Sequence, residues 1–221
     1  MKKTSILLST IATSMMLGSA SAYEAGDVVL RAGPATASPD ASSSEVRLAG
    51  VAVPGSVVDV DDDTQLGLTG TYMVSDSFGI GLLAATPFSH DVSAIGIGVA
   101  DVATVKHLPP TLTLQYFPFD SDSAWQPYIG AGINYTTFFS EKTSGELNGA
   151  LGDSSISLDD SFGLALEAGV DYAINDKWLV NASLWRLDLD TEATIDSPVA
   201  QVTVDVEIDP WVYMLGLGYK F

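Results

Sequence analysis

The sequence contains no cysteine, few basic residues and no long apolar run. Its 221 residues include 9 lysines and arginines against 28 aspartates and glutamates. Without cysteine the chain has neither disulfides nor thiolate metal ligands, so an exported form needs another source of stability. The scarcity of basic residues argues against nucleic-acid binding, which requires a basic surface. After the first segment, no stretch approaches the ~20 apolar residues of a membrane-spanning helix.

The N-terminal segment, residues 1–22, is typical of a secretory signal peptide. Met1-Lys2-Lys3 is basic, residues 6–17 are apolar, and Ala20-Ser21-Ala22 has the small residues of a cleavage site. Such a segment is removed on export, so we predict one mature domain of residues 23–221. With 47% hydrophobic residues and no spanning helix, this domain must distribute its apolar residues in some other way.

The C-terminal segment, residues 211–221, has the clearest pattern in the chain. Its odd positions are Trp211, Tyr213, Leu215, Leu217, Tyr219 and Phe221, and its even positions are Val, Met, Gly, Gly and Lys. Side chains of a strand alternate between two faces, so one face of this strand is apolar with aromatic ends. Strands of outer-membrane barrels have this arrangement. Tyr219 and Phe221 also resemble the C-terminal signal that barrel-assembly machinery recognises.

The same alternation recurs along the chain and predicts eight strands. They are expected at residues 28–33, 65–74, 78–88, 108–119, 125–139, 160–174, 178–189 and 201–221. Long connections, at 36–63, 89–107, 140–159 and 190–200, alternate with short turns at 75–77, 120–124 and 175–177. Bacterial outer-membrane barrels have an even number of strands, short periplasmic turns and longer outer loops. We therefore predict an all-β fold, an eight-stranded antiparallel transmembrane β-barrel in a Gram-negative outer membrane, with both termini in the periplasm.

The lipid bilayer requires that the barrel be closed. The bilayer core has no water to satisfy a free strand edge, so the last strand must pair with the first. Aromatic girdles are expected at the periplasmic interface from Tyr72, Phe78, Phe119, Trp125, Tyr172, Trp178 and Tyr219, and at the outer interface from Phe88, Phe138, Phe139, Trp211 and Tyr213. The alternative, a soluble lipocalin-like barrel, would need polar residues on the outer face, where the alternation places Leu, Ile and Phe.

Positions in the opposite phase are expected to face the lumen. The polar ones predicted to form a network there include Arg31, Gln115, Glu167, Asp171 and Lys220. Charges within a membrane protein face its interior and pair, so this network either plugs the lumen or provides a polar path. Leu83 and Trp185 share the phase and are predicted to form an apolar constriction, with ordinary packing as the alternative. If they form a gate, alanine at both positions should raise ion conductance.

Two histidines flank the second long connection. His90 and His107 have no G-x-S-x-G sequence and no third group at a fixed spacing to complete a catalytic triad. No metal-ligand spacing surrounds them. We therefore expect solvated loop histidines, no enzyme activity, no metal and no cofactor. The intervening residues 92–105 are apolar for a loop and are expected to fold onto the barrel mouth or form a short lid.

Several segments of the mature chain are long and specific. They are residues 106–112 (Lys-His-Leu-Pro-Pro-Thr-Leu), residues 127–139, Asp209-Pro210-Trp211 and the closing Gly218-Tyr219-Lys220-Phe221. These segments resemble the outer-membrane protein W (OmpW) family, and the resemblance spans the mature chain except for its long outer connections. It implies an eight-stranded barrel with a narrow, partly apolar lumen, in a family linked to passage of small, often hydrophobic molecules.

Two functions remain open from the sequence. One is a narrow channel or carrier for small hydrophobic molecules, with outer-membrane lipid, the barrel-assembly machinery and a small hydrophobic solute as partners. The alternative is a plugged structural or surface-receptor barrel whose loops bind phage, bacteriocin or host partners. A continuous polar plug would favour the receptor, and an open apolar pocket near Leu83 and Trp185 would favour transport. The oligomeric state stays open.

Overall fold

The computed structural model describes residues 23–120 and 123–221. The predicted signal peptide, residues 1–22, lies outside the described residues. Within the described parts of the chain, no helix is both long and apolar enough to cross a membrane.

Eight strands form a closed antiparallel barrel. In order around the ring they are β10 (Thr111–Tyr116), β7 (Phe78–Ala85), β6 (Asp63–Ser75), β1 (Val28–Ser38), β17 (Trp211–Lys220), β14 (Trp178–Leu187), β13 (Ser161–Ala173) and β11 (Trp125–Thr143). Pairing of β10 with β11 closes the ring. The first and last barrel strands, β1 and β17, are direct neighbours. The predicted eight-stranded antiparallel barrel is confirmed.

The two faces of the barrel wall have opposite chemistry. In β10, Thr111, Thr113 and Gln115 are buried in the lumen, whereas Leu112 and Leu114 are exposed on the outer face. The other barrel strands follow the same rule, with exposed large side chains that include Leu30, Leu66, Leu68, Ile80, Leu82, Ile129, Ile133, Leu164, Leu166, Leu215 and Leu217. Because large apolar residues cover the outer face and the buried charged residues of the wall point inward, the wall suits an apolar solvent rather than water.

Aromatic residues mark the periplasmic end of the wall as predicted. Trp125 packs on Tyr172 with ring centroids 4.7 Å apart, and Trp178 packs on Tyr219 at 5.0 Å. Tyr219 also contacts Phe221, the last residue of the chain.

The prediction of the outer girdle is partly wrong. Trp211 and Tyr213 are exposed on the outer face, but Phe88 is only 1% exposed and lies inside the molecule. Phe138 packs against a second core outside the barrel.

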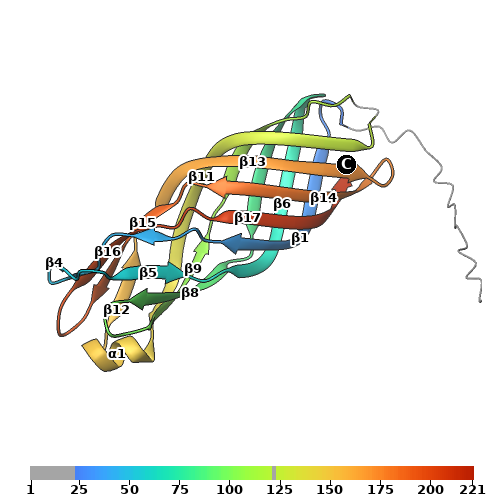
Figure 1. The fold of residues 1–221 in the computed structure, drawn as a ribbon. Coiled ribbons are helices and arrows are strands. Elements are labelled where there is room, and N and C mark those ends of the chain that lie inside the picture. The colour runs from blue at the N-terminus through green and yellow to red at the C-terminus, as the bar shows by residue number, and fades with distance from the viewer. Residues whose placement is uncertain (1–22, 121–122) are drawn as a thin grey trace, which may run out of the picture.

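The long outer connections are folded, contrary to the predicted loops. They contain helix α1 (Gly145–Leu151) and nine described strands: β2 (Ser42–Ser43), β3 (Arg47–Leu48), β4 (Val51–Ala52), β5 (Val57–Val60), β8 (Phe88–Ile95), β9 (Asp101–Leu108), β12 (Ser155–Leu158), β15 (Asp190–Asp196) and β16 (Val202–Glu207). We call this part the extension. It continues the barrel at the end away from the C-terminus (Figure 1).

Two sheets enclose the core of the extension. One has the order β12-β15-β16-β3-β4, and the other runs β9-β8-β5 from the outer part of β11. Their valines and isoleucines bury one another, and Leu147 of α1 joins this core. The Ser144 side chain caps α1 by accepting the Leu147 N–H. Residues 92–105 belong to this core through the β8–β9 hairpin, so they are a wall of the extension rather than a lid.

Two strand boundaries lie at prolines. The predicted strand 201–221 is two strands, because Pro210 has no N–H for a ladder and Asp209 has a left-handed φ of 41°. β16 therefore lies in the extension and only β17 in the barrel. The predicted strand 108–119 is shortened to β10, which begins directly after Pro109-Pro110.

Candidate functional site

The interior changes character along the barrel axis. On β14, Leu179 lies in an apolar cluster near the periplasm, Asn181 and Ser183 follow, and Trp185 and Leu187 then enter a second apolar cluster. β1 repeats the order, with Val29, then Arg31, then Ala35. A polar layer therefore separates two apolar layers inside the barrel.

An ion pair forms the centre of the polar layer. Arg31 Nε donates to Asp171 Oδ1 at 2.9 Å, and Nη2 bonds the other carboxylate oxygen, so the contact is bidentate. Tyr23 Oη and Asn181 Nδ2 also donate to Asp171. Arg31 and Asp171 are 2% and 1% exposed. Such a buried charge pair depends on both members, because either one alone would be an uncompensated charge.

A second carboxylate, Glu167, lies on the same strand as Asp171, four residues earlier on β13. Glu167 accepts hydrogen bonds from Thr113 Oγ1 at 2.7 Å and from Gln115 Nε2 at 2.9 Å. Thr71 links the two halves, because its hydroxyl accepts from Arg31 Nη1 and donates to Gln115 Oε1. We call the set Arg31, Thr71, Thr113, Gln115, Glu167, Asp171 and Asn181 the polar layer. Its members come from β1, β6, β10, β13 and β14 and fill the lumen from several sides.

The structure brings four of the five predicted network residues together. Arg31, Gln115, Glu167 and Asp171 are joined by the bonds above, whereas Lys220 pairs with Asp27 at 3.6 Å nearer the periplasmic rim. Sequence reasoning missed Thr71, which has the inward phase of β6 but carries no charge to single it out. It also missed Tyr23, the first residue of the predicted mature chain, for which the sequence has no signal.

Leu83 and Trp185 lie in one cluster directly outside the polar layer. We call this cluster the neck; its members are Ala35, Ala37, Leu83, Phe88, Ala165, Trp185, Leu187, Val212 and Met214. Leu83 is 4% and Trp185 1% exposed, so the neck is closed by side-chain packing. Their role as a gate stays a prediction.

The extension contains two apolar cavities above the neck. The outer one has a volume of about 290 Å³, and residues of α1 and of both sheets line it, among them Leu147. The inner one, about 70 Å³, reaches His90, His107 and Phe138. Both cavities are lined by Val58, Val102, Ile195 and Val204, so they are neighbours within one core. Phe88 of the neck stacks on His107 at the inner end.

The histidines are buried, so the prediction of solvated loop histidines is wrong. His90 Nε2 and His107 Nε2 are 2.9 Å apart, and His107 stacks between Phe88 and Phe138. Antiparallel pairing of β8 with β9 brings them together, with Phe88 opposite His107. Burial, together with the neighbouring His90, lowers the pKa of His107 from 6.5 to about 3, although Asp63 opposes this. His107 is therefore neutral at physiological pH.

One group of acidic residues has a geometry that a cation could use. Carboxylate oxygens of Asp188, Asp190 and Asp209 lie within 4.8 Å of one another at the rim between barrel and extension. Arg186 already pairs with Asp209 at 3.2 Å and supplies positive charge there. Burial, with its acidic neighbours, raises the pKa of Asp190.

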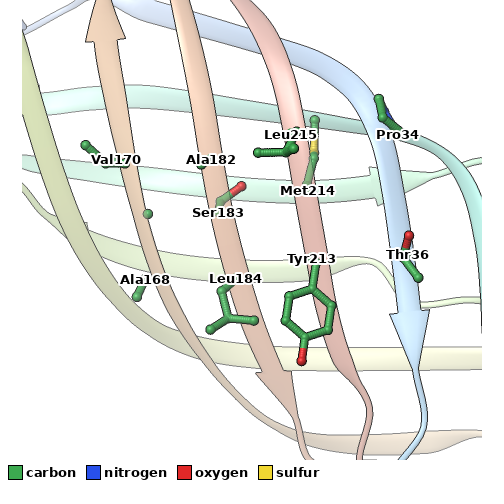
Figure 2. Close-up of a pocket in the computed structure, with 11 residues that line it drawn as sticks. Pro34, Thr36, Ala168, Val170, Ala182, Ser183, Leu184, Tyr213, Met214 and Leu215 are labelled. Carbon is green, nitrogen blue, oxygen red and sulfur yellow. The ribbon is translucent and has the colours of Figure 1, made fainter.

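A groove runs over the outer wall across β13, β14, β17 and β1 (Figure 2). Small outward residues, Ala168 and Ala182 among them, make the wall thin there, and Tyr213 borders the groove. Met214 of the neck also belongs to the lining of this groove, although its side chain faces inward and is 1% exposed, so the backbone of β17 separates the neck from the groove here. Pairing of β1 with β17 is interrupted next to Met214, around Pro34, which has no N–H to donate.

Comparison with known proteins identifies the family. The OmpW family model matches residues 24–221. Outer membrane protein W of Escherichia coli K12 is 46% identical over 223 aligned residues, which cover 100% of both chains. The chain belongs to the OmpW family. Its fold agrees with the crystal structure of OprG from Pseudomonas aeruginosa, at a TM-score of 0.88 and 47% identity over 91% of this chain and 98% of that one.

This OmpW-family chain is therefore an outer-membrane barrel of the Gram-negative type. The matching family model is that of the OmpW barrels, and this match gives no indication of catalytic activity. A more distant relative from Pseudomonas aeruginosa is named dibenzothiophene metabolism operon protein PahQ; it is 27% identical over 181 residues, 81% of this chain and 82% of that one. Tyr219 lies near the end of β17, and Phe221 directly follows that strand and contacts Tyr219; their recognition by the assembly machinery stays a prediction.

The polar layer changes what is expected of the neck in this OmpW-family barrel. Replacing both Leu83 and Trp185 with Ala should leave single-channel ion conductance in a planar bilayer at the wild-type level. The physical reason is that the hydrogen-bonded layer beneath the neck still fills the lumen. Discrete current steps found only in the double variant would show that the neck is the seal, as the sequence suggested.

Proposed function

We propose that the protein carries small apolar molecules from the cell exterior into the outer membrane, and that they leave the barrel sideways. The observation that carries this proposal is a pair of apolar cavities in the extension, above a lumen that the polar layer fills. An apolar solute gains from transfer into such cavities, by roughly 25 cal/mol for each Å² of its surface removed from water.

The path toward the periplasm is unfavourable for such a solute. To pass the polar layer it would have to separate Arg31 from Asp171 and leave buried charges without partners. Breaking a buried pair costs about 3–5 kcal/mol, far more than a few apolar contacts return. A barrier of that size would slow passage toward the periplasm by roughly two to four orders of magnitude.

A sideways path meets less resistance. The neck consists of apolar side chains, and Met214 belongs both to the neck and to the lining of the outer groove. The interrupted pairing around Pro34 leaves fewer ladder hydrogen bonds to break at this seam. A solute that displaces Met214 and separates β1 from β17 at this seam would enter lipid without contacting the polar layer. The name of PahQ, which refers to metabolism of the apolar compound dibenzothiophene, is consistent with apolar cargo in the family.

A disulfide across the seam tests the route. Thr36 and Tyr213 are direct partners on β1 and β17, and since the chain has no cysteine, Thr36→Cys with Tyr213→Cys would form a single bond. Uptake of radiolabelled naphthalene by cells that make the oxidised variant should fall to the level of cells without the protein. Reduction should restore it.

A matched control uses the other seam of the same strand. Ala32→Cys with Leu68→Cys joins β1 to β6, also at directly paired outward positions, and should leave uptake unchanged. If the Thr36–Tyr213 bond has no effect on uptake, the sideways route at this seam is wrong. If wild-type cells take up no more naphthalene than cells without the protein, the receptor alternative replaces transport.

A further inference from the structure

Four buried side chains separate the two cavities of the extension. We call them the partition; they are Val58, Val102, Ile195 and Val204, and each lines both cavities. Val58 and Val102 come from β5 and β9 of one sheet, and Ile195 and Val204 from β15 and β16 of the other. Because side chains that line both cavities lie between them, a solute that moves from the outer cavity to the inner one must pass the partition.

The partition is stiff. All of its members are branched at Cβ, so each side chain has a restricted χ1 and cannot turn aside without strain. The neck differs, because it includes Met214, and methionine adapts easily to irregular space. Discrimination by size is therefore sharper at the partition than at the neck.

Polar side chains do not contribute to selection at this point. Apart from Gly96, the outer cavity is lined by Val, Leu, Ile and Ala. His90, His107 and Thr191 belong to the lining of the inner cavity, but none of their polar atoms contributes to its surface. One apolar molecule therefore differs from another here only in its bulk and shape.

The two cavities differ in the size of molecule that they hold. An enclosed apolar cavity of roughly 150 Å³ holds benzene. The outer cavity, at about 290 Å³, has room for a hydrocarbon of one or two rings. The inner cavity, at about 70 Å³, is smaller than benzene requires, so such a molecule displaces the partition as it moves inward. The displacement increases with the bulk of the molecule.

We propose that the partition sets the size limit of the carrier: hydrocarbons with one ring pass it quickly, and those with two fused rings pass it slowly. The inference rests on the proposed function and names the residues that select its cargo. Forcing extra atoms into a packed core is unfavourable enough to slow the larger molecule by roughly 5- to 150-fold. The two-ring solute then remains longer in the outer cavity, whereas the one-ring solute continues to the neck.

The test measures uptake of radiolabelled toluene and naphthalene by cells, with the uptake of cells without the protein subtracted. The quantity compared is the ratio of the naphthalene rate to the toluene rate, because partition into membrane lipid affects this ratio equally in every variant. Val204→Ala removes two methyl groups from the partition and should raise the ratio about fivefold or more. Val204→Ile adds a methyl group and keeps the branch at Cβ, so it should lower the ratio.

Val202→Ala is the matched control. Val202 lies two residues before Val204 on β16, is also buried, and lines the outer cavity but not the inner one. This variant loses the same two methyl groups outside the partition and should leave the ratio unchanged. Equal ratios in the wild type, Val204→Ala and Val204→Ile would overturn the size limit and leave apolar carriage standing. If wild-type cells take up neither solute above background, the proposed function fails and the size limit with it.

A second measurement uses only the wild type, as the full mature chain in lipid nanodiscs with isotope-labelled isoleucine methyl groups. Ile97 lines only the outer of the two cavities, and Ile156 and Ile208 line only the inner one. Toluene should shift all three methyl resonances, whereas naphthalene should shift that of Ile97 alone. Equal shifts of Ile156 and Ile208 by the two solutes, at matched shifts of Ile97, would contradict selection at the partition.

Discussion

Replacing Arg31 with Met should lower the free energy of unfolding by about 3–5 kcal/mol, the usual cost of breaking a buried ion pair. Methionine keeps an unbranched apolar stem without the guanidinium, so it leaves Asp171 without its cation, at a position that is 1% exposed. Tyr23 and Asn181 would still donate to the carboxylate, but neither supplies charge. Denaturant unfolding of the refolded barrel in lipid vesicles would measure the loss.

The double variant separates the charge from the packing. Asp171→Asn removes the unpaired charge and keeps an oxygen that Tyr23 can donate to, so Arg31→Met with Asp171→Asn should be clearly more stable than Arg31→Met alone. Purely additive losses in the two single variants would contradict a pair that acts as a unit. Thr113→Val, which removes one neutral donor from Glu167, gives a reference loss of about 1–3 kcal/mol in the same layer.

The sequence was sufficient to predict the barrel, because the alternation of apolar and polar residues is strong in strands that have one face toward lipid. In β17, Trp211, Tyr213 and Leu215 face outward and Val212 and Met214 inward, as the period of two required. The requirement for closure then left one partner for the last strand. The same period placed Arg31, Glu167 and Asp171 in the lumen.

The alternation could not predict which of these lumen residues contact one another. Arg31 and Asp171 are 140 positions apart, and their contact depends on the register of strands that are not neighbours in the chain. Lys220 shares the inward phase but lies closer to the periplasmic end, where Asp27 is its partner. The alternation along a strand determines whether a side chain points inward or outward. Its position along the barrel axis depends on the pairing register between strands.

The extension was missed for a different reason. Several of its strands are short, β2 to β4 having two residues each, and they lie in connections rich in Ser, Gly and Asp. Such segments form strands because they pair with distant segments, as β16 does with β2 and β3. The apolar residues of 92–105 were the one signal of a core, and the burial of His90 and His107 followed from that core rather than from their own sequence context.

Acid should weaken the extension through His107. Its pKa is about 3 in the folded state and 6.5 when unfolded, so between these values only the unfolded state binds the proton. Stability is unaffected above pH 6.5 and falls with decreasing pH by about 1.4 kcal/mol per unit down to about pH 3. His90 opposes a charge on the ring and Asp63 favours one. From pH 7 to pH 5 the expected loss is about 2 kcal/mol.

Amide hydrogen exchange of β8 and β9, corrected for the intrinsic effect of pH, is the measurement for this loss. A change of about 2 kcal/mol corresponds to roughly 30-fold faster opening of the hairpin at pH 5. His107→Phe is the matched control, since it keeps the stacking on Phe88 and Phe138 but cannot bind a proton. The many carboxylates titrate in both proteins and cancel in the difference. Equal pH dependence in the two proteins would mean that the hairpin opens without exposing His107, and the imidazole would then have no part in the acid response.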